Sequence, residues 1–211
     1  MTVTDEAKTT GFAHLPHNQA AENNKRAIAQ VWETLGLGQK RVFEIGSGTG
    51  QHGIFFCQQF PALSWQASEQ AANLPLLTAW YEAAQSLEIA NFAAPLIFDV
   101  SKPTWPTEAF DTVYCANVLH ILERSLARRM IEQVTSHLES NQLFVCYGPF
   151  KREGEFTTAS NRDFDAWLQA QGYGGLLDMA DIENDSEHQL KLKHCLDMPA
   201  NNFVLVFTKV Q

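Results

Sequence analysis

Strand-like and helical segments alternate along the first two thirds of this chain, with few residues between them. Apolar residues at Ile28, Val31, Trp32 and Leu35 follow the spacing of one helix face and predict a helix over residues 18–35. This alternation is typical of a parallel sheet covered by helices on both faces. Strands are expected at 41–45, 63–69, 95–100, 110–118 and 142–147, and further helices at 51–59, 74–87 and 124–138.

The chain changes character after the fifth of these strands. Residues 151–190 are interpreted as a lid or insertion on the substrate side of the fold, with one helix expected at about 161–171. Two strands follow within residues 192–209, separated by a short Pro-Asn segment. Because so few residues cannot form a crossover helix, these strands should pair as an antiparallel hairpin. The expected fold is an α/β three-layer sandwich with a mostly parallel seven-stranded sheet.

Length and composition set the class of protein. The 211 residues fit a single domain, expected over residues 18–211 after a polar lead-in at 1–17. The lead-in lacks the basic and apolar regions of a signal peptide, and no apolar run approaches the roughly 20 residues that span a bilayer. The net charge of −9 disfavours nucleic acid or an anionic membrane as the main partner.

The cysteines and histidines indicate neither disulfides nor a metal site. The four cysteines form no C-x-x-C pair, which suits a reducing cytoplasm. His14 and His17 sit in the polar N-terminus, and His188 and His194 have no partners at metal-ligand spacing, so no metal is expected. We therefore expect a cytoplasmic protein with a small-molecule partner, and we leave its oligomeric state open.

The stretch VFEIGSGTGQHG, residues 42–53, carries four glycines that can be aligned in two frames. Counted from Gly48 they give G-x-G-x-x-G, the dinucleotide pattern, but this frame starts two residues late, because Gly46 is the glycine that directly follows the strand. Counted from Gly46 they give G-x-G-x-G directly after the strand, with the acid Glu44 just ahead. At the carboxyl end of a strand, such a loop lets the backbone approach a ligand closely. We favour the Gly46 frame, in which Gly50 completes the loop and Gly53 serves helix packing.

Two more acids end the next two expected strands. Glu69 stands 19 residues after Gly50, where an acid can accept hydrogen bonds from both ribose hydroxyls of an adenosine ligand, NAD included. Asp99 lies near the end of the strand expected at 95–100. Structural alternatives stay open, because Glu44 could cap a backbone amide, Glu69 could be a solvated loop acid, and Asp99 could cap the following turn.

The segment EIGSGTG resembles the first motif of class I S-adenosylmethionine-dependent methyltransferases. More narrowly, six segments resemble the bacterial domain-of-unknown-function 938 family, itself similar to class I methyltransferases: AAENNKRAI, EIGSGTGQHG, WQASE, NVLHI, YGPFKREGEFTTASNRDFD and DMPANN. The resemblance runs from about residue 18 to the end and implies the Rossmann-like class I methyltransferase fold. Glu69 replaces an Asp common in relatives, and its longer side chain still reaches a ribose. The family's substrate is not established.

The resemblance implies a site for S-adenosylmethionine, with S-adenosylhomocysteine as the product. In it Glu44 would balance the cofactor's positive charge, and Asp99 would face the adenine amino group. The cofactor-binding residues would be Glu44, Gly46, Ser47, Gly48, Gly50, Glu69, Asp99, Val100 and Asn117.

Methyl transfer needs few catalytic side chains, because the cofactor supplies an activated carbon and the protein chiefly aligns the reactants. His120 is a candidate general base, and Tyr147 is a candidate residue of the acceptor pocket. Ser160, Asn161 and Asn201 are candidates for contact with the acceptor, although helix capping and turn formation also explain them. Loop ordering likewise explains His120, and a place in the core explains Tyr147.

The expected function is methyl transfer from S-adenosylmethionine to an unidentified small molecule by direct displacement. YGPF lacks the start of the N-P-P-Y motif, so amide or nucleobase amine methylation gains no support. Two alternatives stay open. One is a non-catalytic module that binds the cofactor. The other is an NAD(P)-dependent oxidoreductase, which would need the Gly48 frame and a sixth parallel strand in place of the hairpin.

Overall fold

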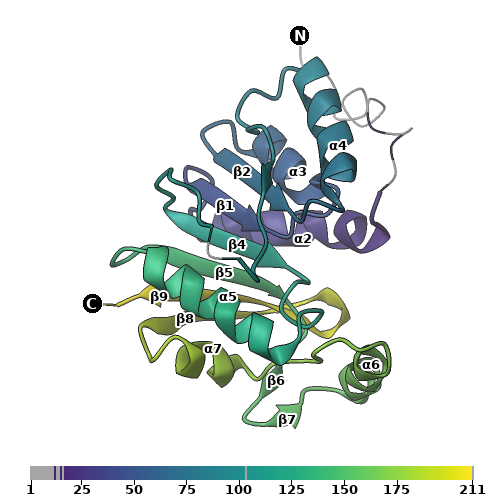
Figure 1. Cartoon of the computed structure of the whole chain (residues 1–211), viewed down its shortest axis with the longest axis vertical. Coiled ribbons are helices and arrows are strands. Elements are labelled where there is room, and N and C mark those ends of the chain that lie inside the picture. The colour runs from purple at the N-terminus through teal and green to yellow at the C-terminus, as the bar shows by residue number, and fades with distance from the viewer. Residues whose placement is uncertain (1–11, 13–14, 16, 103, 211) are drawn as a thin grey trace. The chain divides into compact units, whose positions relative to one another are not determined.

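The computed structural model describes residues 12, 15, 17–102 and 104–210, so most of the lead-in expected at 1–17 lies outside the described residues. The chain divides into two compact units, Met1–Phe98 and Asp99–Gln211. Seven strands follow the order β3-β2-β1-β4-β5-β9-β8, the first three in the first unit and the other four in the second (Figure 1). No helix of the described residues is both long and apolar enough to cross a bilayer.

The first unit is a parallel three-stranded arrangement with helices. β1 pairs with β2 and β2 with β3, all in parallel. Four of the five β1 residues are buried, as expected for a parallel strand covered on both faces. Trp32, Phe56 and Trp65 pack together in the core, with ring centroids 5.4 Å apart in each pair. The elements are α2 (Gln19–Thr34), β1 (Arg41–Ile45), α3 (Gln51–Gln59), β2 (Ser64–Glu69), α4 (Leu74–Ser86) and β3 (Leu96–Ile97).

The second unit contains the antiparallel end of the sheet. β4 and β5 are parallel, whereas β9 runs antiparallel to both β5 and β8. The predicted C-terminal hairpin and the mostly parallel seven-stranded fold class are confirmed. The elements are β4 (Thr112–Ala116), α5 (Arg124–His137), β5 (Leu143–Gly148), β6 (Lys151–Arg152), β7 (Glu155–Phe156), α6 (Ala159–Ala170), α7 (Met179–Asp185), β8 (Leu190–Met198) and β9 (Asn202–Lys209).

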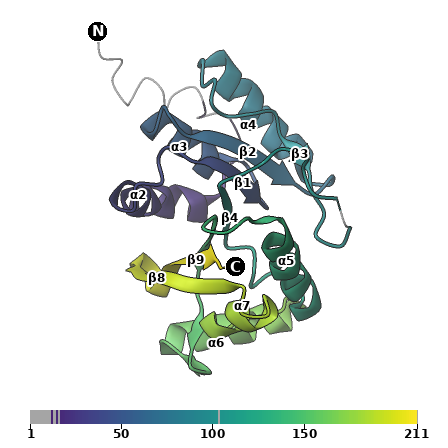
Figure 2. The same cartoon turned by 90° about the vertical axis from the view of Figure 1, so that its left-hand side faces the viewer.

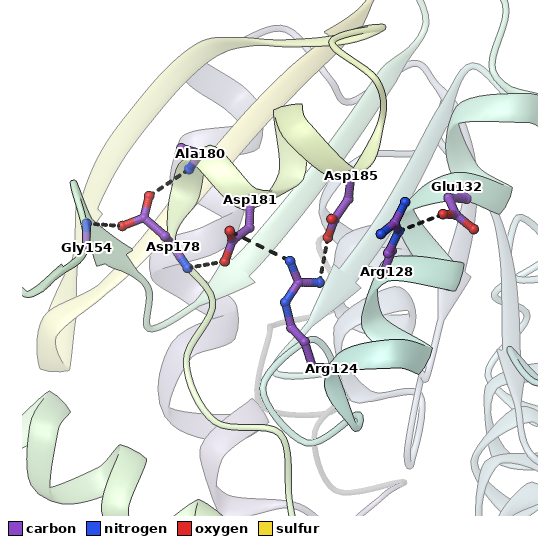
Figure 3. A network of polar contacts seen from close by, with 8 residues as sticks. All are labelled: Arg124, Arg128, Glu132, Gly154, Asp178, Ala180, Asp181 and Asp185. Atoms are coloured by element: carbon purple, nitrogen blue, oxygen red, sulfur yellow. Dashed lines mark hydrogen bonds and ion pairs between the residues drawn. The ribbon is translucent and has the colours of Figure 1, made fainter.

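Helices α5 and α7 lie side by side in the second unit (Figure 2). Arg124, the first residue of α5, places Nη1 2.6 Å from Oδ2 of Asp185 and Nη2 3.7 Å from Oδ1 of Asp181 (Figure 3). Asp178 caps α7 in a reciprocal capping box with Asp181. The guanidinium therefore joins the start of α5 to two positions one turn apart on α7.

The main differences from expectation lie at β3, at α6, and at α7 with the β6–β7 hairpin. The strand expected at 95–100 is reduced to Leu96–Ile97, because the chain then turns at Asp99. Helix α6 begins at Ala159, two residues before the expected start, because Thr158 is its N-cap and accepts a hydrogen bond from the Asn161 amide. Helix α7 and the small β6–β7 hairpin were not predicted, since both are too short to show a clear period.

Candidate functional site

The glycine loop follows β1 in the first unit and leads into α3. Gly46, Gly48 and Gly50 have φ of 71°, 57° and 84°, a left-handed region that glycine enters without strain. A Cβ at Gly48 would meet no heavy atom within 4 Å, whereas one at Gly50 would lie 2.6 Å from Cδ1 of Leu77. The loop is thus closed on the Gly50 side and has open space beside the Gly48 backbone.

Glu69 ends β2 and holds this loop. Its Oε2 accepts a hydrogen bond from the Gly48 amide at 2.8 Å, and Oε1 accepts one from the Gln70 amide at 2.8 Å. The Asn73 side-chain amide donates to Oε1 at 3.4 Å. The residue is 7% exposed, so it is not a solvated loop acid. The structure therefore brings together the two features that the sequence separates by 21 positions.

Glu44 is buried beneath the loop. Its Oε2 accepts a hydrogen bond from the Trp65 indole at 2.9 Å, and the Ser47 hydroxyl is a second partner. Burial raises the pKa of Glu44 to about 7, although these two hydrogen bonds act in the opposite direction. The backbone carbonyl of Glu44 accepts from the Ser68 hydroxyl at 2.6 Å. Ser47 also accepts a hydrogen bond from the Ser68 amide at 3.0 Å, so this carboxyl and hydroxyl order the loop.

Gly53 distinguishes the two glycine frames. It lies inside α3, and a Cβ there would come within 2.4 Å of Trp65 Nε1 and 2.7 Å of Phe92 Cε2. Its role is close packing of helix against strand one turn after the loop, as the Gly46 frame predicts. The three glycines with left-handed backbone are the first three of the stretch.

Sequence reasoning missed a group of polar residues that supports the loop. The Gln51 side-chain oxygen accepts hydrogen bonds from the Thr49 hydroxyl at 2.7 Å and from the Asn18 amide at 2.6 Å. Its side-chain nitrogen donates to Glu22 at 3.2 Å. The start of α2 is thereby tied to the start of α3. The only signal for this contact was that both segments belong to the family resemblance.

Asp99 and Val100 stand at the start of the second unit. The Asp99 Oδ1 accepts hydrogen bonds from the hydroxyl and the amide of Ser101, at 2.7 and 2.9 Å. These bonds, together with Lys102 at 3.2 Å, lower the pKa of Asp99. Val100 is buried and its carbonyl accepts from the Gln133 side chain at 3.3 Å. In this structure Asp99 caps the turn, the alternative that the sequence left open.

The ends of β4 and β5 meet around His120. Asn117 adopts φ of 57°, unusual for a residue other than glycine, and its amide donates to the Tyr147 carbonyl at 2.8 Å. A Cβ at Gly148 would lie 3.6 Å from both Asn117 Oδ1 and His120 Nδ1. Tyr147 is itself 4% exposed. Asn117, His120 and Tyr147 therefore lie close together within the second unit.

His120 is a buried neutral imidazole. It is 7% exposed, and burial alone lowers its pKa to about 4. Among the described residues, no side-chain hydrogen bond to this ring is found, and its neighbours include the ring of Phe164 with centroids 5.6 Å apart. It lies before α5 rather than at the start of that helix. A buried imidazole of this kind has a lone pair available to accept a proton.

Ser160, Asn161 and Asn201 come together, although 40 positions separate the helix from the hairpin. The Asn161 side chain donates to the Asn201 carbonyl at 3.0 Å, and the Asn201 side chain donates to the Ser160 hydroxyl at 3.0 Å. Neither Ser160 nor Asn161 is the N-cap, which is Thr158. Asn201 has φ of 58° in the turn between β8 and β9. These contacts join the start of α6 to that turn.

Comparison with solved structures finds the same fold at low sequence identity. Human N-acetylserotonin methyltransferase in complex with S-adenosylmethionine has a TM-score of 0.67 and 13% identity, over 89% of this chain and 55% of that one. An O-methyltransferase family 2 protein from Planctomyces limnophilus, in complex with apigenin, has a TM-score of 0.69 and 15% identity, over 81% of this chain and 51% of that one. PigF with S-adenosylhomocysteine has a TM-score of 0.74 and 13% identity, over 90% of this chain and 56% of that one. This chain thus spans little more than half the length of those chains.

These likenesses establish a class I methyltransferase fold. The family is established separately, by a model that covers nearly the whole sequence. Its match extends over residues 15–209, close to the range of the resemblance described above. The chain therefore belongs to the family described as protein of unknown function DUF938.

Proposed function

We propose that this protein is an S-adenosylmethionine-dependent methyltransferase that acts on a small molecule. The observation that carries the proposal is the contact between Glu69 and the glycine loop. A buried carboxylate at the end of β2 lies within 2.8 Å of the Gly48 amide, and open space adjoins the Gly48 backbone. An adenosine ligand needs this combination, a close approach to backbone and an acid for its ribose hydroxyls.

The residues of the first unit fit this cofactor. Glu69 has four lone-pair positions on its two oxygens, and within the described residues three hydrogen bonds to them are found. Glu44 supplies a carboxyl whose ionised form would complement a cation, and its pKa of about 7 would fall next to one. When bound, S-adenosylmethionine supplies a methyl group on positively charged sulfur, so transfer to a nucleophile is a direct displacement.

The residues of the second unit serve the acceptor. Because burial keeps His120 neutral near pH 7, its imidazole can accept a proton from an acceptor hydroxyl as the new bond forms. Asn117 and Tyr147 hold the loop and strand end around this ring. The Ser160–Asn201 pair offers polar groups near the start of α6. The low pKa makes His120 a weak base, so it can assist only a hydroxyl whose acidity rises as the methyl group arrives.

Ligand binding tests the proposal directly. Thermal shift and calorimetry with S-adenosylmethionine, S-adenosylhomocysteine and NAD should show binding of the two sulfur compounds alone. Glu69→Gln, which removes the charge and keeps one acceptor oxygen for the Gly48 amide, should weaken both by about tenfold, the scale of a lost charge-assisted hydrogen bond. Glu33→Gln, an exposed glutamate of α2, is the matched control and should leave both affinities unchanged.

Three outcomes of these measurements would contradict the proposed function or its site. Binding of NAD without binding of the sulfur compounds would replace the methyltransferase by an oxidoreductase. Unchanged affinities in Glu69→Gln would remove this residue from the site. Tight binding of S-adenosylhomocysteine with no methyl transfer to any acceptor would favour a cofactor-binding module.

A further inference from the structure

We propose that the acceptor is a planar aromatic compound carrying a hydroxyl group, held on a row of rings formed by His120, Phe164, Trp167 and Tyr173. The proposal deepens the proposed function, because it names the substrate class of that same site. All four rings belong to the second unit. Below, they are called the aromatic row.

The rings follow one another at contact distance. Phe164 meets the His120 imidazole edge-to-face, with centroids 5.6 Å apart and an interplanar angle of 71°. Trp167 lies next to Phe164 at 5.8 Å, nearly parallel at 11°. Tyr173 continues the row at 6.5 Å from Trp167. The aromatic row therefore leads from a buried imidazole to solvent-exposed rings.

Local structure places each ring. Phe164 and Trp167 are one turn apart on α6, at i and i+3, so they share one face of the helix. A glycine then ends the helix in a Schellman motif: the Gly172 amide donates to Gln169 and the Tyr173 amide to Leu168, both at 3.0 Å. This turn brings the Tyr173 ring back beside Trp167.

The segment after the helix is anchored to the His120 loop. The Gly175 amide donates to the His120 carbonyl at 3.1 Å, and a Cβ at Gly174 would lie 2.1 Å from the Leu122 carbonyl oxygen. On the buried side of α6, Asp165 accepts a hydrogen bond from the Leu176 amide at 2.7 Å. The aromatic row is consequently presented by a backbone that is fixed at both ends.

Exposure indicates that the row binds something flat. Trp167, Tyr173 and Phe164 are 53%, 44% and 36% exposed, and Ile121, next to His120, is 44% exposed. Exposed apolar side chains scattered singly need no explanation, but four in one neighbourhood indicate a binding site. Nearly parallel Phe164 and Trp167 offer ring faces that stack on a planar molecule more favourably than on a saturated one.

The buried end of the row specifies a hydroxyl. His120 is more than nine-tenths buried, and its ring makes no hydrogen bond within the described residues. A buried imidazole gains from a partner that donates a hydrogen bond to its free nitrogen. A hydroxyl at the edge of an aromatic ring provides that donor while the ring itself rests on Phe164 and Trp167. Polar substituents at the other edge would meet Ser160, one turn before Phe164 on α6.

The transfer balances with these groups. A lone pair of the hydroxyl oxygen forms the new C–O bond to the methyl carbon of S-adenosylmethionine, and the C–S bond breaks with its electron pair left on sulfur. The hydroxyl proton passes to His120. The positive charge lost from sulfur thus reappears as imidazolium, and the products are an aryl methyl ether and S-adenosylhomocysteine.

Three bicyclic probes separate planarity from the hydroxyl. Calorimetry on the full chain loaded with S-adenosylhomocysteine would compare 2-naphthol, its flexible saturated analogue decahydro-2-naphthol, and its methyl ether 2-methoxynaphthalene. We expect 2-naphthol to bind about tenfold more tightly than the saturated analogue, the scale of one aromatic stacking contact. With S-adenosylmethionine in place of the product, mass spectrometry should detect 2-methoxynaphthalene formed from 2-naphthol.

Substitutions test whether the aromatic row is responsible for the affinity for 2-naphthol. Trp167→Ala should weaken 2-naphthol about tenfold, and Trp167→Phe should restore most of that affinity, because a ring face returns. Leu192→Ala, an exposed apolar residue of β8, is the matched control and should change nothing. His120→Gln should abolish ether formation while the dissociation constant of 2-naphthol changes only a few-fold. None of these variants should alter the affinity for S-adenosylhomocysteine.

The failures are distinguishable. If S-adenosylhomocysteine does not bind, the proposed function fails and this inference falls with it. If it binds but 2-naphthol does not, or if Trp167→Ala leaves the 2-naphthol affinity unchanged, the inference alone is overturned. Sedimentation gives one further outcome: a wild-type dimer that Trp167→Ala converts to a monomer, without probe binding, would make the aromatic row a self-association surface.

Discussion

Replacing Gly53 by alanine tests the packing that separates the glycine loop from the helix after it. The new Cβ would lie 2.4 Å from Trp65 Nε1, 2.5 Å from Trp65 Cδ1 and 2.7 Å from Phe92 Cε2, whereas nonbonded carbon atoms prefer about 3.5–4.0 Å. Trp65 and Phe92 are 0% and 1% exposed, so neither ring can move into solvent. The indole must shift by about 1 Å, which also strains its hydrogen bond to Glu44.

The expected cost follows from three contributions. Overpacking of a full core costs about 1–3 kcal/mol, and loss of the buried indole hydrogen bond adds about 1–2 kcal/mol. Alanine returns about 1 kcal/mol through its better helix propensity. The net loss is about 1–4 kcal/mol of unfolding free energy, or a melting temperature lower by about 2–16 °C for a chain of this size.

Urea unfolding followed by circular dichroism measures this loss. Gln59→Ala, at the exposed end of the same helix, is the control and should stay within about 0.5 kcal/mol of wild type. A Gly53→Ala protein as stable as wild type would show that the Trp65 side chain can shift without a loss of stability. The assignment of Gly53 to packing rather than to the ligand loop would then be refuted.

Three further predictions concern the loop, its buried acid and the second unit. Gly50→Ala should destabilise the protein more than Gly48→Ala in thermal unfolding, because both strain a left-handed backbone by about 1–2 kcal/mol but only Gly50 also meets a side chain, at 2.6 Å. Glu44 has a pKa of about 7 in the folded protein against 4.5 in the unfolded chain, so the stability of the wild type should fall by about 3 kcal/mol as the pH rises from 4.5 to 7. Glu44→Gln should lack this loss, and parallel curves of stability against pH for the two proteins would contradict the prediction. In chemical unfolding, Arg124→Ala should cost about 1–2 kcal/mol because it leaves the buried Asp185 carboxylate without its ion-pair partner (Figure 3). Arg128→Ala removes an exposed ion pair on the same helix and should cost under about 0.5 kcal/mol, and equal costs would show that the Arg124 pair acts only as a surface contact.

Much of the fold could be predicted from local patterns. The strand over 41–45 and the helix over 51–59 have the expected bounds, because hydrophobic periodicity reports which face of an element is buried. The C-terminal hairpin followed from chain connectivity, since a short segment cannot cross over a sheet. The short helix α7 escaped prediction because seven residues complete barely two turns.

For the candidate site, too, local sequence patterns predicted some features and the tertiary structure decided the others. The sequence by itself predicted that the glycine loop follows β1 and that Glu44 and Glu69 lie near the ends of β1 and β2, because these features depend only on adjacency to a strand. Only the tertiary structure decided that Glu69 binds the Gly48 amide, that Gln51 meets Asn18, and that His120 stands at the end of the aromatic row. These contacts join positions from 21 to 44 residues apart, and no local periodicity records which buried faces will meet when the chain folds.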